Sequence, residues 1–302
     1  MKVKLVLLVL LPVLAAGVVL HTLHLDVLLW QSWKLNRQQM HEQAFNLGRY
    51  RVDIEALEVQ GIDDDLSALT FNSDTNSLFG VLNGKPVMVE LSLDGELLRE
   101  ITVKGVIDME GLTHVEDDLY VIAEERSQRL ILARIAADTL SLDLSEAPGL
   151  TIGLDQAGNK GFEGLSWDGE EQRLLVVKER DPLRLLAVTG FVDANPGAPL
   201  NISITEIKPA ASPRLFMNDL SSLTLHDASG HMLLLSDESR MVVEYDAEGA
   251  PLSLLGLWRG LAGLQASVPQ AEGLAVDDGR RLYIVSEPNL FYRFVPQDSA
   301  QP

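Results

Sequence analysis

The sequence predicts an all-β protein, a five-bladed β-propeller. The main observation is a short phrase that recurs five times at intervals of 43 to 58 residues, which is the length range of a propeller blade. Each phrase is followed by a polar turn and a compact apolar run, the pattern of a buried strand. Beyond residue 60 no amphipathic helical pattern exceeds about three turns, which argues against helical repeats. The phrases are Ser67–Thr70, Glu110–Thr113, Glu163–Ser166, Ser221–Thr224 and Glu272–Ala275.

Residues 1–30 predict a signal-anchor or transmembrane helix. Lys2 and Lys4 precede an uncharged, mostly aliphatic run over 5–20, between the length of a signal-peptide core and that of a spanning helix. Trp30 and Trp33 suit a membrane interface. A cleaved signal peptide and a buried soluble helix remain as alternatives. The two lysines should stay cytoplasmic, which would place the propeller on the periplasmic side of a bacterial inner membrane as a single-pass protein.

Residues 31–48 read as a stalk, and 49–298 as the propeller domain. Apolar strands are expected at 78–83, 119–125, 174–179, 233–238 and 282–287. The last unit has room for only three strands, so the alternating segment 50–57 is expected to supply its outer strand and close the ring. A sixth blade remains an alternative if 126–161 or 180–216 contains an irregular one.

The composition excludes several classes of function. The 302 residues include 24 Lys and Arg against 44 Asp and Glu, a net charge of −20, which opposes binding to nucleic acid. The chain has no cysteine, so thiol catalysis, zinc–thiolate sites and iron–sulfur clusters are ruled out.

Acidic residues recur at fixed places in the repeat. One set begins the predicted innermost strands, and the equivalent positions of successive blades surround the central axis. Its members, with the nearby Asp219, are the candidate metal ligands Glu110, Glu163, Asp219 and Glu272. A second set ends the following strands and is expected to support the first: Asn83, Glu125, Glu179, Glu238 and Glu287. Asp65 and Asp108 stand two residues before Ser67 and Glu110, as Asp219 stands two residues before Ser221.

Clustered carboxylates need compensation to stay ionised. Oxygen-only ligands favour Ca²⁺, with Mg²⁺ less favoured. The alternative is structural bonding, in which the carboxylates accept hydrogen bonds from backbone amides or pair with Arg126, Arg180 and Arg240. For the second set this structural alternative is the stronger interpretation.

Several segments resemble the SdiA-regulated family of bacterial proteins. They are Gly161–Leu165, Lys178–Pro182, Ser236–Arg240, Gln270–Leu274 and Tyr283–Phe294. The resemblance covers roughly residues 60–296 and implies a five-bladed propeller, distantly related to NHL-repeat propellers, with a calcium site. It implies no established reaction. Ser67 and Ser221 depart from the Glu pattern, so the ligand ring is not symmetric.

Three functions follow as hypotheses. The first is a membrane-anchored, extracytoplasmic calcium-binding propeller that binds a small molecule or a protein partner. The second is a calcium-dependent hydrolase of the lactonase or esterase type, with Glu179, Glu287 or Asp237 as base; few lysines lie near the phrases, which disfavours a phytase-like site. The third is an interaction scaffold in which the ring only joins the blades. Fold analogy does not choose among them.

Overall fold

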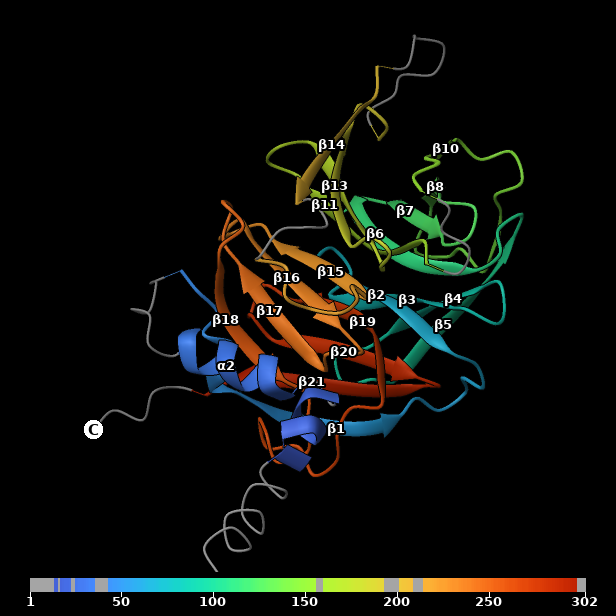
Figure 1. Ribbon diagram of the computed structural model, residues 1–302. Coiled ribbons are helices and arrows are strands. Elements are labelled where there is room, and N and C mark those ends of the chain that lie inside the picture. The colour runs from blue at the N-terminus through green and yellow to red at the C-terminus, as the bar shows by residue number, and fades with distance from the viewer. Residues whose placement is uncertain are drawn as a thin grey trace, which may run out of the picture.

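Five β-sheets surround a central axis in the computed structural model, which describes residues 14–15, 17–22, 25–35, 43–155, 160–192, 201–208 and 214–297 (Figure 1). Their innermost strands, β2, β6, β11, β15 and β19, contact one another in this cyclic order, and β19 returns to β2. The predicted five-bladed propeller is therefore confirmed. The six-bladed alternative fails because the segments 126–161 and 180–216 provide outer strands of blades one to three.

Each blade is a sheet of four antiparallel strands that follow one another from the channel to the rim. Blade one contains β2 (Leu66–Asn72), β3 (Ser77–Leu82), β4 (Val87–Leu91) and β5 (Leu97–Lys104), with β9 (Ser141–Asp143) added in parallel to β5. Blade two contains β6 (Met109–Glu116), β7 (Leu119–Glu124), β8 (Arg129–Arg134) and β10 (Gly149–Thr151). Blade three contains β11 (Phe162–Asp168), β12 (Arg173–Lys178), β13 (Arg184–Thr189) and β14 (Ser203–Lys208). Blade four contains β15 (Ser222–His226), β16 (His231–Ser236), β17 (Met241–Tyr245) and β18 (Pro251–Gly256). Blade five contains β19 (Gln270–Val276), β20 (Leu282–Glu287), β21 (Leu290–Pro296) and β1 (Tyr50–Glu58).

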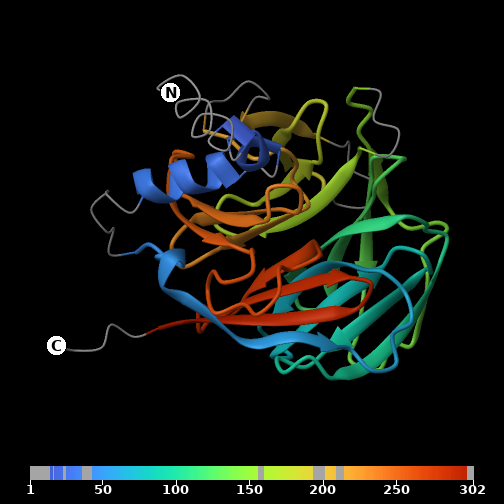
Figure 2. The ribbon, with the colours of Figure 1, turned by 60° about the horizontal axis from the view of Figure 1, so that its bottom comes forward.

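The ring closes by pairing the two ends of the propeller sequence. Strand β1 runs antiparallel to β21, from Tyr50 opposite Pro296 to Glu58 opposite Leu290. In Figure 2 the blue β1 lies along the red C-terminal strands. This confirms the predicted closure by the segment 50–57. Blade five thus gains a fourth strand, and β21 is not left as an exposed edge that could pair with another chain.

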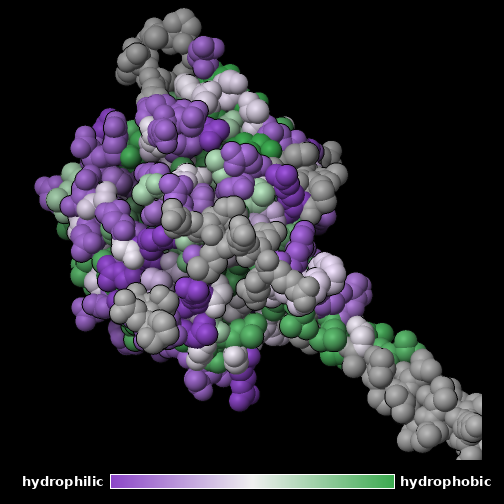
Figure 3. Space-filling view, turned by 90° about the vertical axis from the view of Figure 1, so that its left-hand side faces the viewer, coloured by the Kyte–Doolittle hydropathy of each residue, from purple (hydrophilic) through white to green (hydrophobic). Residues whose placement is uncertain are grey.

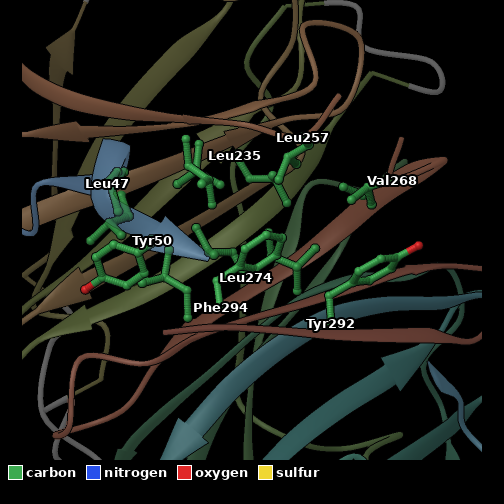
Figure 4. Packing of buried hydrophobic residues seen from close by; sticks show 14 of the residues in the cluster. Leu47, Tyr50, Leu235, Leu257, Val268, Leu274, Tyr292 and Phe294 are labelled. Atoms are coloured by element: carbon green, nitrogen blue, oxygen red, sulfur yellow. The ribbon is translucent and has the colours of Figure 1, made fainter. Parts of the chain in front are cut away.

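Side chains from neighbouring blades fill the space between the sheets. Between blades four and five, Leu235 and Leu257 pack with Leu274 and Phe294 in one buried cluster (Figure 4). Tyr50 joins this cluster with no exposed surface and donates its hydroxyl to the carbonyl oxygen of Arg280 at 2.8 Å. The centres of the β3, β7, β12, β16 and β20 strands are apolar because both of their faces are buried against adjacent blades.

Hydroxyl groups of the repeated phrases join adjacent blades. The amide of His114 donates to Thr70 Oγ1 at 3.2 Å, and the amide of Trp167 donates to Thr113 Oγ1 at 3.0 Å. The amide of Leu225 donates to Ser166 Oγ at 2.9 Å. Each bond satisfies an inner-strand amide that faces the neighbouring blade instead of a strand of its own sheet, which gives the Ser or Thr of the phrase a structural role.

The N-terminal segment differs from the expected anchor. In the described residues no helix is both long enough and apolar enough to cross a bilayer. Helix α2 (Leu25–Leu35), part of which lies in the expected anchor, packs instead against β18 (Figure 1). Its side chains Leu28 and Leu35 are buried in the cluster between blades three and four. Residues 1–13, which hold the two N-terminal lysines, lie outside the described residues.

The segment that precedes β1 also packs on the propeller. Phe45 and Leu47, at the end of the expected stalk, are buried between blades four and five. The amide of Phe45 donates to Glu244 Oε1 at 2.8 Å, and His231 Nδ1 lies 2.8 Å from the same oxygen. A single-turn 3₁₀ helix, η1 (Leu47–Arg49), then leads directly into β1. The chain is therefore fixed to blade four before the ring-closing strand begins.

Candidate metal centre

A β-bulge aims the first acidic set at the central axis. In β6, Met109 pairs with Glu124 and Gly111 with Ala123, so Glu110 lies outside the ladder between them. Glu163 and Glu272 occupy the same bulge in β11 and β19, and Ser67 occupies it in β2. A bulge re-aims the side chain of its extra residue. The repeated bulge explains why these side chains converge although their neighbours in the strands face the blades.

The glycine after each glutamate lets the inner strands approach closely. A Cβ atom added to Gly273 would lie 2.9 Å from the backbone carbon of Ala68 in blade one. One added to Gly164 would lie 2.7 Å from the amide nitrogen of Leu223 in blade four. These distances are shorter than real Cβ contacts allow, so the Gly of the phrase is a requirement of packing around a narrow axis. The same narrowness forces the preceding carboxyl groups together.

The nine residues predicted from the sequence line one cavity of about 260 Å³ at this mouth of the channel. Four further lining residues were not among the predicted ligands and their supports, namely Arg180, Ser221, Asp237 and Gln270. Of these, Asp237 was considered only as a candidate base, and Arg180 only as a partner of the carboxylates. The lining that the described residues provide contains nine carboxyl groups and one guanidinium group: Asn83, Glu110, Glu125, Glu163, Glu179, Arg180, Asp219, Ser221, Asp237, Glu238, Gln270, Glu272 and Glu287. Gln270 could have been found from its offset, since it precedes Glu272 by two residues as Asp219 precedes Ser221.

The closest oxygen clusters combine the two predicted sets. Glu125, Glu163 and Glu179 each offer a carboxylate oxygen within 4.8 Å of the other two. Asp108, Glu110 and Glu125 form a second group of this kind. Glu125 and Glu179, expected only to support the first set, are thus as well placed to hold a cation as Glu163.

Burial and mutual repulsion oppose ionisation of the ring. Burial, followed by the charges of Glu125 and Asp108, raises the pKa of Glu110 to about 8. Burial raises the pKa values of Glu179 and Glu287 to about 7. The pKa values of Glu163 and Glu272 are raised well above the ordinary range, first by burial and then by neighbouring carboxylates. Without a cation, the ring therefore holds several protons near neutral pH.

Part of the ring is held by hydrogen bonds within the protein. Asp219 accepts hydrogen bonds from the Ser236 hydroxyl and from the amide of Glu238. Glu125 Oε1 accepts from the amide of Gly161 at 3.1 Å. For Asp219 in particular, the structural alternative accounts for its position, because its carboxylate anchors the turn after β16.

One of the three arginines considered in the sequence enters the cavity. Arg180 Nε lies 3.1 Å from Glu179 Oε1, and its Nη1 donates to Glu238 Oε1. Arg126 instead lies 3.5 Å from Asp108, and Arg240 donates to the carbonyl oxygen of Val268 and stacks on Trp258. Arg180 offsets one of the nine possible negative charges, so the cavity still favours a cation.

The opposite mouth of the channel has a second, larger cavity of about 690 Å³. Its walls are the C-terminal ends of the inner strands and include Thr70, His114, Trp167 and His226. The two histidines have local partners, since His114 Nε2 lies 3.0 Å from the carbonyl oxygen of Asp117, and His226 Nδ1 lies 2.9 Å from Ser229 Oγ. Acidic residues at the ends of the inner strands and in the turns that follow also line this cavity, namely Asp74, Glu116, Asp117, Asp227, Asp277 and Asp278.

A closed ring of five blades, four of them four-stranded and the first with a fifth strand, surrounds an axial channel and defines the protein as a five-bladed β-propeller. The sequence profile of the SdiA-regulated family matches residues 42–295, and the chain belongs to that family. The resemblance inferred from the repeated phrases is therefore confirmed.

One solved structure shows a similar fold at low sequence identity, and a second gives a weaker match. A luciferin-regenerating enzyme superimposes with a TM-score of 0.51 at 10% identity, covering 81% of this chain and 95% of that protein. A chain from a nidogen–laminin complex gives a TM-score of 0.45 at 14% identity, covering 73% of this chain and 72% of that one. The first likeness shows a common fold and nothing about the reaction.

Proposed function

We propose that this protein is an extracytoplasmic calcium-binding propeller that binds a small molecule or a protein partner at its acidic mouth. The observation that carries the proposal is the single cavity of about 260 Å³ with nine carboxyl groups and one guanidinium group. A divalent cation would offset the repulsion that otherwise keeps several of these groups protonated. The ion would thereby join side chains from several blades and would also lie in the cavity where a ligand binds.

The residues present fit a hard cation. Calcium takes six to eight oxygen ligands at about 2.3–2.6 Å, so two ligand oxygens on one ion lie within about 5 Å of each other. The carboxylate oxygens of Glu125, Glu163 and Glu179 meet this limit, as do those of Asp108, Glu110 and Glu125. Among the described residues, no nitrogen or sulfur donor lines the cavity apart from the amides and the guanidinium, which favours Ca²⁺ over zinc or copper.

A calcium-dependent hydrolase of the lactonase or esterase type is the second candidate. It is favoured by the number of carboxyl groups, because Glu287 and Asp237 line the same cavity yet belong to neither close oxygen cluster. A bound calcium ion would supply Lewis acidity toward a substrate oxygen. Asp237 accepts a hydrogen bond from the amide of Ala271 at 3.1 Å, which orients its carboxylate at the cavity. A panel of lactones and aryl esters, assayed with Ca²⁺ and with EDTA, separates this candidate from a binding module.

We also propose that the propeller works on the periplasmic side of a bacterial inner membrane, attached through its N-terminal segment. The support is the uncharged run over 5–20 preceded by Lys2 and Lys4, together with the tryptophans at 30 and 33. Basic residues stay on the cytoplasmic side of such a segment. Flotation of the full chain with membrane vesicles tests the attachment, and recovery of the protein only in the soluble fraction would contradict it.

Calcium binding is tested by thermal unfolding of the full chain in mild detergent, first with EDTA and then with increasing Ca²⁺ or Mg²⁺. An ion that binds only the folded state stabilises it by about 2.7 kcal/mol at one hundred times its Kd. We expect a rise of the melting temperature with Ca²⁺ and a smaller rise with Mg²⁺. The absence of any shift with either ion would show that the ring is held by its own hydrogen bonds and protons.

Two substitutions locate the ion. Glu163→Gln removes a charge from the cluster with Glu125 and Glu179, and we expect at least about a tenfold loss of Ca²⁺ affinity in calorimetry. Glu272→Gln lies outside both close clusters and should weaken binding less, through the loss of a nearby charge. Glu116→Gln, at the exposed far end of β6, is the matched control and should leave the affinity unchanged. Equal affinities in all three variants would place the ion elsewhere.

A further inference from the structure

Helix α2 has apolar side chains on two opposite faces. Leu28 and Leu35 are buried against the fourth blade, and they lie on one face because an α-helix advances about 100° per residue. Leu29, Trp30 and Trp33 lie on the other half of the helix and are 57%, 60% and 48% exposed. The two indole rings stack with their centroids 5.1 Å apart. One face thus explains how the helix docks on the propeller, whereas the outward face is too apolar for a surface that only meets water.

The apolar surface continues into the helical residues before α2. Of the thirteen large hydrophobic side chains that are exposed in the described part of the chain, seven lie between residues 14 and 33. Scattered exposed apolar residues are normal, but such a concentration marks an interaction surface. Figure 3 shows apolar side chains gathered at the lower right of the molecule. The seven are Leu14, Val18, Val19, Leu20, Leu29, Trp30 and Trp33.

The chemistry of this surface matches a lipid bilayer. Tryptophan is enriched at the level of lipid headgroups, where its ring is buried and its N–H remains hydrated. Beyond the proposed membrane segment, residues 21–35 contain one lysine and one aspartate, whereas the whole chain has a net charge of −20. This region can therefore approach a bilayer surface that repels the acidic body of the propeller. Asp26, the one acidic residue of the region, lies 3.0 Å from His21 Nδ1.

We propose that the outward face of α2 lies flat on the bilayer interface, with Trp30 and Trp33 among the headgroups, and that it holds the fourth blade toward the membrane. The inference rests on the proposed membrane attachment and adds the surface of the propeller that meets the bilayer. No residue of α2 lines either described cavity. Contact through α2 therefore leaves the acidic mouth free to bind its ligand while the propeller is held at a fixed orientation.

Quenching of tryptophan fluorescence by brominated lipid tests this contact. The full chain has four tryptophans, of which Trp167 and Trp258 belong to the propeller. The variant Trp167→Phe/Trp258→Phe keeps only the two tryptophans of α2, and Trp30→Phe/Trp33→Phe keeps only those of the propeller. In vesicles whose lipids carry bromine near the headgroup end of the acyl chain, we expect the first variant to lose about half or more of its emission, since interfacial helices insert about 5–10 Å. The second variant should lose little.

The outcomes separate this inference from the attachment itself. If the protein does not float with vesicles, both proposals fail. If it floats but the two variants are quenched equally, attachment stands and the docking of α2 is wrong. Protection of Trp30 and Trp33 from aqueous acrylamide without quenching by brominated lipid would show that a protein surface, such as a second copy of this chain, covers the helix, and would also overturn the proposal.

Discussion

Replacing Glu110 with glutamine tests whether the ring holds protons when no cation is bound. The pKa of Glu110 is raised to about 8, first by burial and then by neighbouring carboxylates, whereas a glutamate in an unfolded chain titrates near 4.3. The folded state therefore binds this proton more tightly than the unfolded state. The resulting stabilisation is fully present below pH about 4, declines as the pH rises, and is lost once the pH passes about 8.

The size of the effect follows from the separation of the two pKa values. At pH 7 the folded carboxyl is still mostly protonated and the unfolded one is ionised, so about 2.7 pH units at 1.36 kcal/mol each give a loss of about 3–4 kcal/mol relative to pH 4. Glutamine has nearly the shape of the protonated acid and does not titrate. Between pH 4 and pH 7 the natural protein should therefore lose about 3 kcal/mol more of its free energy of unfolding than Glu110→Gln loses.

Urea unfolding of the full chain in mild detergent with EDTA measures this difference at several pH values. Glu116→Gln provides the control, because Glu116 is exposed at the other end of the same strand. If the stability difference between Glu110→Gln and the natural protein is the same at pH 4 and pH 7, the reasoning about protonated ring carboxyls is refuted. If Ca²⁺ binds the ring as proposed, excess Ca²⁺ at pH 7 should raise the stability of the natural protein.

Two further predictions concern the propeller itself. Gly273→Ala would place a methyl group 2.9 Å from the backbone of Ala68 and should lower the free energy of unfolding by about 1–3 kcal/mol. The control Gly153→Ala, with no atom within 4 Å of the added methyl group, should change this free energy little. Equal effects of the two substitutions in urea unfolding would disprove the close-approach argument. Tyr50→Ala removes a fully buried ring from the closing strand and should lower the free energy of unfolding by about 3–5 kcal/mol. Leu57, on the same strand, is 40% exposed, and Leu57→Ala should lower it by well under half of that amount. An unchanged melting temperature of Tyr50→Ala would mean that β1 does not stabilise the ring.

The pattern of the chain was sufficient for the architecture because repeats carry their own evidence. Five equivalent phrases, each followed by an apolar run, predict five sheets whose central strands are buried on both faces. The missing strand of the last unit was identified from the alternation of residues 50–57, and its pairing with β21 follows. The N-terminal segment has no such repeat. Its hydropathy alone predicted an anchor, whereas helix α2 buries Leu28 and Leu35 on the propeller.

At the acidic mouth, too, the sequence predicted part of the arrangement and the tertiary structure decided the rest. The recurrence of Glu before Gly-Leu was enough to predict that Glu110, Glu163 and Glu272 converge, because equivalent positions of a closed ring share one axis. Which oxygens lie within reach of one cation depends on the bulges and on the turns after the second strands. These turns bring Glu125 and Glu179 beside Glu163.

The sequence by itself predicted five blades, with a sixth left open, together with the closing strand and most of the side chains at the acidic mouth. It could do so because strand patterning and repetition are local properties of the chain. Only the tertiary structure decided which carboxylates are mutual neighbours, that Arg180 enters their cavity while Arg126 and Arg240 do not, and that α2 lies against blade four. Those outcomes depend on distances between residues far apart in the chain, and such distances are set by packing around the axis.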